Sequence, residues 1–540
     1  MIACARSLPP RWLARTETAL ALGATLVALV LHVRLFLGAG PLWRDEINTV
    51  VVATQPTLAG VWDRLERESF PLLPYALLHG WRAGGLAETD AGFRALGLIV
   101  GLSAIAALWW NQARVRLAPP LLALVLFAID PVVVRWGDSL RGYGLGAVAV
   151  LVTFPLVFAA VRNPRPLNVA LAALAATAAV QTVYQNSVLV FAIGVAAALV
   201  ALRWNRPRRA VVALGIGGVA ALSLLPYVAL MGRARQYRLV SVEGATPGHL
   251  ASVFWRALGP EIGVGWPGYV LGAAWVGAVA AAIVAGTVRP SGSARRRALA
   301  LYGLLVVLIA LPVQLAFLLL LGFPTAPWYW LPLLALMAVA LEAALQIRSR
   351  TFRVGRLVLA GGLLVLVAPR AFAYVGLRQT NVDLAADAVA AAQPDDFVVV
   401  SPWFLAVSFN RYYKGAAPWS TIPPLEDTSV HRTDLLARQL QAEDPVAPLV
   451  ARVESTLRGG HRVYWVGLPA PASDSPPGAM PPRREPVDGR LLGLYVAHWT
   501  LDVAQALRRS GTTEPVPLAP HPSPQPYERA RVWVTTGAPP

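Results

Sequence analysis

Hydrophobic and polar positions divide this chain into a long membrane-like part and a mixed C-terminal part. Up to residue 378, apolar runs of roughly 17–25 residues, long enough to cross a bilayer as helices, alternate with polar connections. We predict transmembrane helices at Thr18–Leu37, Phe93–Trp110, Pro120–Trp136, Tyr143–Val161, Leu167–Tyr184, Ser187–Leu202, Ala210–Met231, Gly268–Thr287, Ala298–Phe323, Trp328–Gln346 and Leu357–Val375. The pattern is that of a polytopic α-helical membrane protein with about eleven transmembrane helices.

Arginines gather in every second connection between the predicted spans. These connections carry Arg6, Arg11 and Arg15; Arg114 and Arg116; Arg162 and Arg165; Arg203, Arg206, Arg208 and Arg209; Arg289 and Arg295 to Arg297; and Arg348, Arg350, Arg353 and Arg356. Short basic connections stay on the cytoplasmic side of a membrane. We therefore expect a cytoplasmic N-terminus, and an odd number of spans then leaves the C-terminus outside the cytoplasm.

The last part of the chain has the shorter periodicity of a soluble α/β domain. The predicted elements are a helix over Val382–Ala392, a strand over Phe397–Ser401, a helix over Thr433–Leu457, strands over Arg462–Leu468 and Val532–Thr536, and a proline-rich loop over Pro469–Pro486. We thus predict a transmembrane domain over residues 1–378 and an extracytoplasmic α/β domain over 379–540. The second domain has no glycine-rich phosphate fingerprint, and we predict no catalytic role for it.

The distribution of charge along the chain bears on whether nucleic acid is a partner. The formal charge is +18, but 33 basic and 13 acidic residues lie up to Arg378, whereas 14 basic and 16 acidic residues follow it. The excess of positive charge thus lies in the membrane part, where topology accounts for it. Nucleic acid is not a predicted partner, because no stripe of basic and aromatic residues is present.

The cysteine count bears on whether the outer domain has a disulfide, and the lysine count bears on the kind of organism. Cys4 is the single cysteine, so the outer domain is predicted to fold without an internal disulfide. The basic residues are 46 arginines and one lysine, Lys414, in a chain rich in Ala, Gly and Pro. This composition predicts a GC-rich genome, as in many bacteria, and the predicted spans place the protein in the plasma membrane.

The first outer loop, residues 39–91, concentrates negative charge. It holds seven of the thirteen acids of the membrane part. Two of them, Asp45 and Glu46, are adjacent, lie just beyond the outer end of the first span, and follow Trp43, a residue type common at the membrane interface. Such a pair is either a solvated loop feature or part of a site that reaches both lipid and water.

The loop returns to the membrane through residues 68–81, which read Glu-Ser-Phe-Pro-Leu-Leu-Pro-Tyr-Ala-Leu-Leu-His-Gly-Trp. With the preceding acid pair, this segment resembles the GT-C class of membrane glycosyltransferases that use lipid-phosphate sugars, near the protein O-mannosyltransferase and aminoarabinose transferase group. In that family an Asp-Glu pair follows the first span, and a Pro-Pro-Leu-Tyr-Tyr-like stretch leads into a leucine-rich segment ending in Trp. This chain keeps Pro71, Tyr75 and Trp81 of that stretch.

The chain also departs from the family pattern. It has Phe70 and Leu72 where the family has a His and a second Pro. A metal contact through that His is therefore not carried over, and we predict a site without metal, although a divalent cation held by Glu68 and another carboxylate stays an alternative.

A second motif, Arg135-Trp-Gly-Asp-Ser-Leu-Arg-Gly-Tyr-Gly-Leu145, resembles the Glu-Ala-Arg-x-Tyr-x-Leu stretch that the family carries between its third and fourth spans. Arg141 and Tyr143 match that stretch. The family Glu falls on Ser139, with Asp138 as a substitute one residue earlier. A looser likeness is Pro324–Pro332, which opens a late span.

The resemblance and the chemistry of sugar transfer together imply roles for these residues. A carboxylate is needed to take the proton of the acceptor hydroxyl, and a guanidinium suits the departing phosphate. The expected catalytic residues are Asp45 as base and Glu46 as its support; Arg141, Tyr143 and Arg44 are expected to bind the donor phosphate and lipid; and Glu68, Asp138 and Tyr75 are expected to bind substrate. No cofactor is required in this scheme.

The resemblance implies transfer of a sugar, with mannose favoured, from a polyprenyl-phosphate donor to a hydroxyl of a glycan, lipid or protein, with inversion at the anomeric carbon. A polytopic transporter or lipid flippase is the alternative, and a noncatalytic assembly protein is a third class. Against transport, the sequence shows no matching pair of interrupted spans in its two halves.

Overall fold

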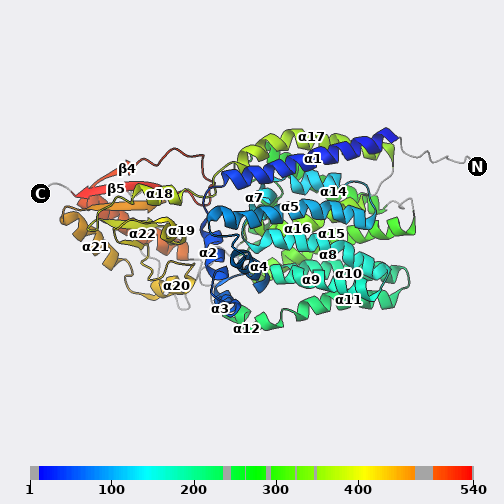
Figure 1. Ribbon diagram of the computed structural model, residues 1–540, viewed down its shortest axis with the longest axis horizontal. Helices are drawn as coiled ribbons and strands as arrows, with labels where there is room; N and C mark the ends of the chain where they lie inside the picture. The colour runs from blue at the N-terminus through cyan, green and yellow to red at the C-terminus, as the bar shows by residue number, and fades with distance from the viewer. Residues whose placement is uncertain are drawn as a thin grey trace, which may run out of the picture. The chain divides into compact units, whose positions relative to one another are not determined.

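The computed structural model describes residues 11–234, 245–261, 263–287, 293–322, 325–345, 349–468 and 491–537. Its contacts separate two compact units (Figure 1). The helical unit comprises Met1–Leu37, Ser69–Val228 and Ala245–Gly376. The sheet unit comprises Gly38–Glu68, Ala229–Gly244 and Leu377–Pro540. The predicted first outer loop is thus shared between the units, with Asp45, Glu46 and Glu68 in the sheet unit.

Nine helical segments of the described ranges are long and apolar enough to cross a membrane. They are Arg11–Gly38 (α1), Asp90–Val115 (α5), Gly142–Arg162 (α8), Asn186–Arg203 (α10), Pro207–Leu230 (α11, Pro207–Leu222; η3, Leu225–Tyr227; and the start of α12, Val228–Ala234), Trp266–Gly286 (within α14, which ends at Thr287), Ala294–Leu321 (α15), Pro327–Ala344 (η5, Pro327–Trp330, and α16, Leu331–Ala344) and Arg350–Val375 (α17). Pro166–Thr182 (α9) is a shorter apolar helix. Two further helices are Leu72–Ala83 (α4) and Pro247–Ala257 (α13). The predicted polytopic helical fold is confirmed.

The predicted third span, Pro120–Trp136, is wrong as one continuous helix. It consists of Leu121–Ala123 (α6), a π-helical turn over Leu124–Ala128 (η2) and Pro131–Gly137 (α7). The break follows from Asp130-Pro131: the Asp130 carboxylate accepts the Val132 N–H at 2.8 Å and caps a new helix, and Pro131 takes the first helical position, where its missing N–H is harmless.

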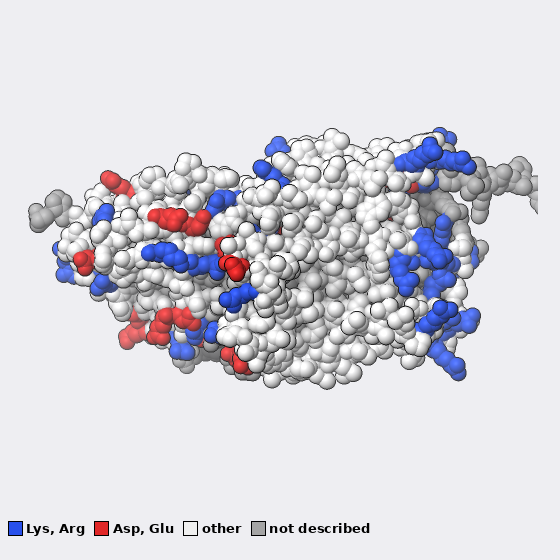
Figure 2. Space-filling model, viewed as in Figure 1, with Lys and Arg blue, Asp and Glu red and all other residues white. Residues whose placement is uncertain are grey.

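Basic side chains gather at one end of the helical unit (Figure 2). Helix α8 ends there at Arg162 and α10 at Arg203, while α17 begins there at Arg350. The gathering agrees with the alternation of basic connections in the sequence; that this end faces the cytoplasm stays a prediction.

A buried ion-pair network ties four segments together within the helical unit. Glu17 of α1 accepts from Arg353 at 2.5 Å and from Arg356 at 3.0 Å, both on α17. Arg356 also pairs with Glu342 of α16 at 2.8 Å, and the second oxygen of Glu342 accepts the Leu122 N–H of α6 at 2.8 Å. Each charge therefore has a partner, as a buried charge requires.

Close helix packing in the helical unit depends on glycine. α8 packs against α5, α9 and α16, and a Cβ at Gly144 of α8 would lie 1.8 Å from the Gly137 carbonyl oxygen. Small residues of this kind let membrane helices approach closely.

Gly144→Ala is expected to lower the stability of the folded protein by about 1–3 kcal/mol, because backbone must move to admit the methyl group. The thermal midpoint of the purified protein in detergent measures this. Gly215→Ala is the matched control, since nothing lies within 4 Å of a Cβ at that position of α11. Equal midpoints for the two variants would contradict the packing argument.

The sheet unit contains a five-stranded sheet in the order β2-β1-β3-β5-β4. The strands are Phe397–Ser401 (β1), Trp419–Thr421 (β2), Arg462–Gly467 (β3), Gly511–Val516 (β4) and Arg531–Gly537 (β5). β1 is parallel to β2 and β3, whereas β5 is antiparallel to β3 and β4. The predicted C-terminal α/β domain is confirmed as a mixed sheet.

Helices cover both faces of this sheet. They are Val382–Ala388 (α18), Ala406–Tyr412 (α19), Thr433–Gln441 (α20), Ala447–Arg458 (α21) and Leu492–Ser510 (α22). Val398 and Val400 of β1 point to the core with α18 and α19, while Val399 points to the core with α20, α21 and α22, as the two-residue period of a strand requires.

Several predictions for this part need correction. The helix predicted over Thr433–Leu457 is divided into α20 and α21, because Asp444-Pro445 breaks it and Asp444 accepts the Ala447 N–H at 3.0 Å. The helix predicted to reach Ala392 ends at Ala388. Strands β2 and β4 and helix α22 were not predicted. The loop predicted over Pro469–Pro486 lies outside the described residues.

The sheet unit also contains three short elements from the first outer loop. They are Arg44–Ala53 (α2), Leu58–Arg64 (α3) and the 3-10 turn Leu65–Arg67 (η1). α2 packs against α19, and the Tyr412 hydroxyl donates to the Leu42 carbonyl at 3.1 Å. The acid pair of the first outer loop therefore lies on a helix that is held by the C-terminal part of the chain.

Candidate functional site

Asp45 occupies the first turn of α2, whose N-terminus is built by its own sequence. Trp43 is the N-cap, and the Glu46 side chain reaches back so that Oε2 accepts the Trp43 N–H at 3.4 Å. Glu46 is fully buried, whereas the Asp45 side chain is 23% exposed. The two adjacent carboxylates therefore face different surroundings, and the positive end of the helix favours the Asp45 anion.

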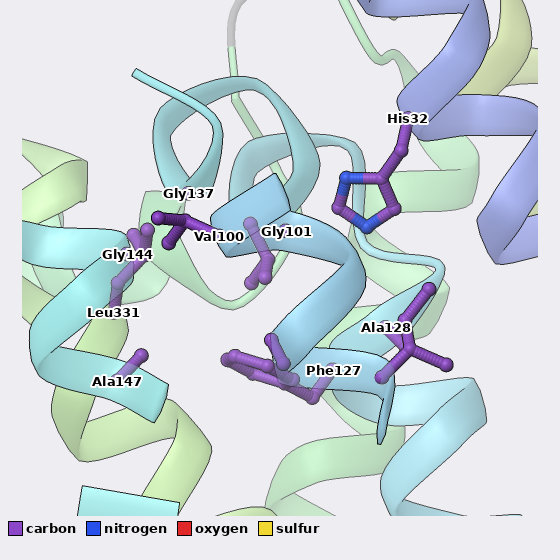
Figure 3. Close-up of a pocket in the computed structure, with 12 residues that line it drawn as sticks. His32, Val100, Gly101, Phe127, Ala128, Gly137, Gly144, Ala147 and Leu331 are labelled. Carbon is purple, nitrogen blue, oxygen red and sulfur yellow. The ribbon is translucent and has the colours of Figure 1, made fainter. Parts of the chain in front are cut away.

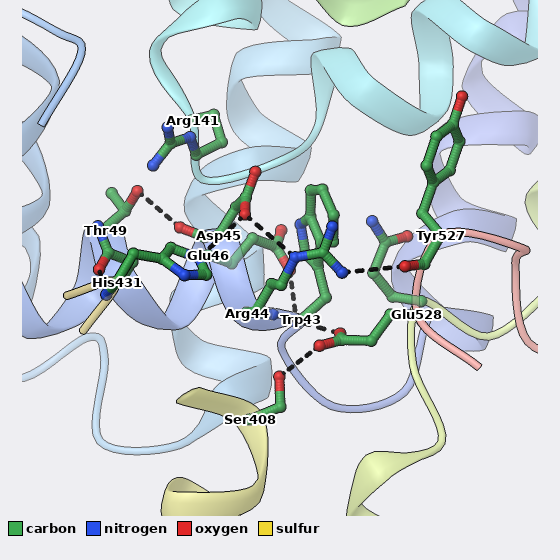
Figure 4. A network of polar contacts seen from close by, with 12 residues as sticks. Trp43, Arg44, Asp45, Glu46, Thr49, Arg141, Ser408, His431, Tyr527 and Glu528 are labelled. Carbon is green, nitrogen blue, oxygen red and sulfur yellow. Dashed lines mark hydrogen bonds and ion pairs between the residues drawn. The ribbon is translucent and has the colours of Figure 1, made fainter. Parts of the chain in front are cut away.

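Arg44 connects the start of α2 to the end of the chain (Figure 4). Its Nη1 donates to the Tyr527 carbonyl at 2.9 Å, and Nε lies 3.7 Å from Asp45 Oδ1. The guanidinium carbon also lies 4.4 Å from the centre of the Phe404 ring. Arg44 is thereby held in one orientation beside Asp45.

Glu528 is a buried residue that stabilises the first turn of α2. It is buried, and its two oxygens accept the Ser408 hydroxyl at 2.7 Å and the Arg44 backbone N–H at 3.3 Å. Burial raises the pKa of Glu528 to about 7, and the positive charge of Arg44 opposes that rise. The carboxyl is thus poised to change its charge near neutral pH.

Glu528→Gln is expected to remove a pH dependence of stability. Because the folded-state pKa is raised, the folded protein holds a proton between the ordinary glutamate pKa and about 7 that the unfolded chain has lost. Stability is therefore full at low pH and falls as pH rises through 7, by about 3 kcal/mol as an order of magnitude. A glutamine keeps one acceptor and one donor for the same two partners.

The measurement is the thermal midpoint between pH 5 and 8. We expect a larger fall for the wild type than for Glu528→Gln, with exposed Glu514→Gln of β4 behaving like the wild type. Parallel curves for all three proteins would show that Glu528 does not titrate in this range.

Asn48, one turn after Asp45 on α2, makes hydrogen bonds to two other segments of the sheet unit. Its Nδ2 donates to Glu68 Oε1, and its Oδ1 accepts the backbone N–H of His431 at 2.9 Å. The His431 ring then lies with Nε2 at 3.3 Å from Asp45 Oδ1. Arg44 and His431 thus flank the same carboxylate oxygen.

The helical unit presents a second cluster at the beginning of α8. The Arg141 guanidinium carbon lies 4.6 Å from the centre of the Phe70 ring, and Nη2 is 3.5 Å from the Ser69 hydroxyl. The Tyr143 ring meets Phe70 edge-on at 4.9 Å and packs on Tyr329 at 5.2 Å. Arg141 therefore lies on an aromatic wall at the end of α8 opposite Arg162.

Gly142 permits this arrangement. A Cβ at that position would lie 2.6 Å from the Thr182 carbonyl oxygen and 2.7 Å from Phe70 Cδ1. The match of Arg141 and Tyr143 to the family motif thus corresponds to a tight local structure, in which the residue between them has to be small.

Asp138 lies in a different environment. Both of its oxygens are 2.8 Å from His32 Nδ1 of α1, and the pair is buried. A Cβ at Gly101 would meet Asp138 Oδ1 at 2.0 Å, so this glycine makes room for the pair. His32 also lines a small cavity of about 20 Å³ with apolar walls (Figure 3), enough for about one water molecule.

The fold of this chain is similar to that of solved structures. A crystal structure of ArnT from Cupriavidus metallidurans in the apo state matches with a TM-score of 0.51 and 12% sequence identity, covering 95% of this chain and 98% of that chain. The chain has the fold of ArnT. A structure of the same protein bound to undecaprenyl phosphate matches with a TM-score of 0.48 and 13% identity, over 97% of this chain and 98% of that one. No protein-family model and no curated protein matches.

The match confirms the GT-C-like fold that the sequence predicted. It covers both the membrane helices and the C-terminal sheet, so the resemblance is not confined to the two short motifs. The chain is therefore a multi-pass membrane protein of this fold.

Within the ArnT-like fold, the predicted site residues fall into two groups. Asp45, Glu46, Arg44 and Glu68 lie together in the sheet unit, and Arg141, Tyr143, Asp138 and Tyr75 lie in the helical unit. Tyr75 is fully buried on α4. The described residues contain no group of three or more His, Cys, Asp or Glu side chains that could hold a metal.

Sequence reasoning missed the C-terminal residues that surround Asp45. His431, Ser408, Tyr527 and Glu528 all lie in the part of the chain to which no catalytic role was assigned. The Asn48 and His431 positions are 383 residues apart, and His431 lies in an ordinary polar loop, so no local pattern indicates the contact. Only the fold brings them to α2.

Proposed function

We propose that this protein is a membrane glycosyltransferase that moves a sugar from a polyprenyl-phosphate donor to an acceptor hydroxyl on the extracytoplasmic side of the membrane. The observation that carries the proposal is the Asp45 carboxylate, partly exposed at the start of α2 and flanked by Arg44 and His431. The ArnT fold and the two family motifs support the same reaction class.

Asp45 acts as the base. A hydroxyl becomes a good nucleophile when its proton is removed during attack, which contributes roughly 10²–10⁴-fold to the rate. Since Arg44 holds one side of the carboxylate, the base has a defined orientation. Glu46, buried and bonded to the backbone of Trp43, stabilises the helix that carries the base.

Arg141 stabilises the departing phosphate. A guanidinium can offer two parallel N–H groups to phosphate oxygens, and the Phe70 ring supports the plane of this one. Negative charge develops on that phosphate as the bond to the sugar breaks. Tyr143 and Phe70 give the site an apolar wall beside the charge, which suits a donor whose other half is a lipid chain.

Arg44 takes a different role from the one predicted. Its guanidinium is engaged by the Tyr527 carbonyl, Asp45 and the Phe404 ring. We therefore assign Arg44 to holding the base. Glu68, Asp138 and Tyr75 stay as proposed substrate contacts, of which Glu68 is the one nearest to the base along the Asn48 contact.

In the proposed step the acceptor oxygen attacks the anomeric carbon opposite the phosphate. The acceptor O–H proton passes to Asp45, the new C–O bond forms, and the old C–O bond breaks with its electron pair going to polyprenyl phosphate. One base and one displacement invert the anomeric centre. Mannose is the sugar we favour, and the acceptor is a glycan, lipid or protein hydroxyl.

The test is sugar transfer by purified protein in lipid vesicles, with polyprenyl-phosphate mannose, glucose and aminoarabinose offered in turn. We expect one donor to release polyprenyl phosphate and glycosylate an acceptor. A transporter would instead move a labelled lipid across the vesicle membrane without releasing sugar, and its rate would not depend on Asp45.

A further inference from the structure

Helices α1 and α17 lie side by side in the helical unit (Figure 1). Glu17 of α1 pairs with Arg353 of α17 near the basic end of the unit. Near the opposite end, the guanidinium carbon of Arg34 of α1 lies 4.7 Å from the centre of the Phe372 ring of α17. The two helices are therefore neighbours along most of their length.

An open groove of about 330 Å³ lies between these two helices. It is lined by Leu29, Val30, Val33, Arg34, Leu37 and Phe372. The residues from α1 recur at helical spacing and share one face of that helix. All five apolar lining residues are exposed, so the groove opens toward the surrounding lipid. Its volume and its apolar walls with one polar group are typical of a ligand site.

The groove has about the depth of one leaflet of a bilayer. From Leu29 to Leu37, α1 rises by about 12 Å at 1.5 Å per residue, and half of a hydrocarbon core of about 30 Å is about 15 Å. Because α1 ends at Gly38, the groove occupies the last part of the span. An acyl chain that belongs to one leaflet therefore fits along it.

Arg34 alone among the six lining residues is charged. Its guanidinium stacks on Phe372, and a Cβ at Gly376 would lie 2.9 Å from Nη2 and 3.2 Å from Nε. Within the part of the chain that the structure describes, no carboxylate pairs with Arg34. The protein thus orients this guanidinium without supplying an anion from its described residues.

An arginine on the lipid-facing side of a span is energetically costly. The positive-inside rule does not account for Arg34, because α1 reaches its predicted outer end a few residues later, at Gly38. An arginine near a helix end reduces the cost by extending toward the interface. A phosphate group reduces it further by bringing the opposite charge and oxygens that accept from the guanidinium.

We propose that this groove binds an anionic glycerophospholipid of the membrane, with its phosphate at Arg34 and one acyl chain along Leu29, Val30 and Val33. The two parts of such a lipid match the charged group and the apolar wall beside it. A polyprenyl chain is longer than the groove, so the sugar donor is not the occupant. The site is separate from sugar transfer and does not rest on the proposed function.

The experiment counts the phosphatidylglycerol molecules that delipidated protein in detergent binds on titration, by native mass spectrometry. We expect the wild type to bind one tight phosphatidylglycerol more than Arg34→Gln does, with affinity at that site about tenfold weaker in the variant, because a charge-assisted contact to phosphate is lost. Phosphatidylcholine with the same acyl chains should not fill this site as tightly, since its own cation competes with Arg34 for the phosphate.

Arg370→Gln is the matched control for the charge. Arg370 is an exposed arginine near the same end of α17, and it does not line the groove. We expect this variant to bind phosphatidylglycerol as the wild type does. An equal loss in Arg34→Gln and Arg370→Gln would show a general attraction of anionic lipid to arginines at this end and would overturn the proposal.

Val33→Trp tests the place of the acyl chain, because the indole fills the groove and leaves Arg34 unchanged. We expect it to lose the same phosphatidylglycerol. Leu26→Trp is its control, since Leu26 is exposed on α1 but does not line the groove. Wild-type binding by Val33→Trp would mean that no chain lies in the groove, and the proposal would fail.

Two further results would also contradict the proposal. One is equal binding of phosphatidylglycerol by the wild type and Arg34→Gln. The other is displacement of the tight phosphatidylglycerol by an equal concentration of polyprenyl phosphate, which would assign the groove to the donor lipid. Thermal midpoints in detergent show whether each variant is folded. Should Arg34→Gln not fold, the comparison of Val33→Trp with Leu26→Trp decides the question with the same expected and contrary results.

Discussion

Asp45→Asn is expected to reduce sugar transfer by about 10²–10⁴-fold, the contribution of a general base. The amide has nearly the same shape as the carboxylate but cannot accept the acceptor proton. Because the loss is confined to the transition state, kcat should fall while KM for the lipid donor changes little. The measurement is a rate of transfer in vesicles at saturating donor.

Asp63→Asn is the matched control for this loss. Asp63 is an exposed acid on α3, in the same outer segment of the sheet unit. It should transfer sugar at the wild-type rate with the wild-type thermal midpoint. Similar rates for Asp45→Asn and Asp63→Asn would remove Asp45 from the chemistry.

Arg141→Ala is expected to lower kcat about 10²–10³-fold, the size of effect seen when one preorganised charge stabiliser is removed from a transition state. Arg141→Lys should recover part of the rate, because an ammonium keeps the charge but loses the planar, two-point grip and the stacking on Phe70. KM for the lipid donor is expected to rise in both variants. A donor titration in vesicles gives both constants.

Arg162→Ala provides the comparison at the other end of the same helix. Arg162 is exposed and ends α8, whereas Arg141 is its N-cap. We therefore expect kcat to fall in Arg141→Ala and to stay at the wild-type value in Arg162→Ala. Equal rates for Arg141→Ala and the wild type would leave the donor phosphate without the ligand we assign to it.

Long apolar runs in the sequence predicted the membrane helices well because such a run is a simple signal. A run of some twenty apolar residues has few outcomes other than a spanning helix. The exception, Pro120–Trp136, failed for a local reason: Asp130 caps a new helix and Pro131 starts it. Hydropathy averaging over a window does not register such a break.

The C-terminal domain shows which elements the sequence pattern predicts and which it does not. The hydrophobic β1, Phe397–Ser401, was predicted with its correct bounds because it is buried on both faces. The edge strands β2 and β4 were missed, since the three residues of β2 and the polar residues of β4 have no strong alternation. The long helix was overextended because its apolar period continues past Pro445.

The candidate site divides in the same way. The acid pair and Arg141 became candidates because their neighbours match family motifs. The residues around them were not found, because Glu528 and His431 reach α2 through tertiary structure. The sequence predicts no catalytic role for the C-terminal domain because that domain has no phosphate fingerprint. The structure shows contacts from the same domain to the first turn of α2.

The central claim is that this protein breaks the bond between a sugar and a polyprenyl phosphate with Asp45 as base. The most direct measurement is the release of polyprenyl phosphate from a labelled polyprenyl-phosphate sugar, in vesicles that contain purified wild type or Asp45→Asn. We predict release and matching sugar transfer by the wild type, and neither by the variant. Release that is equal in both proteins, or absent from the wild type with every donor, would contradict the claim.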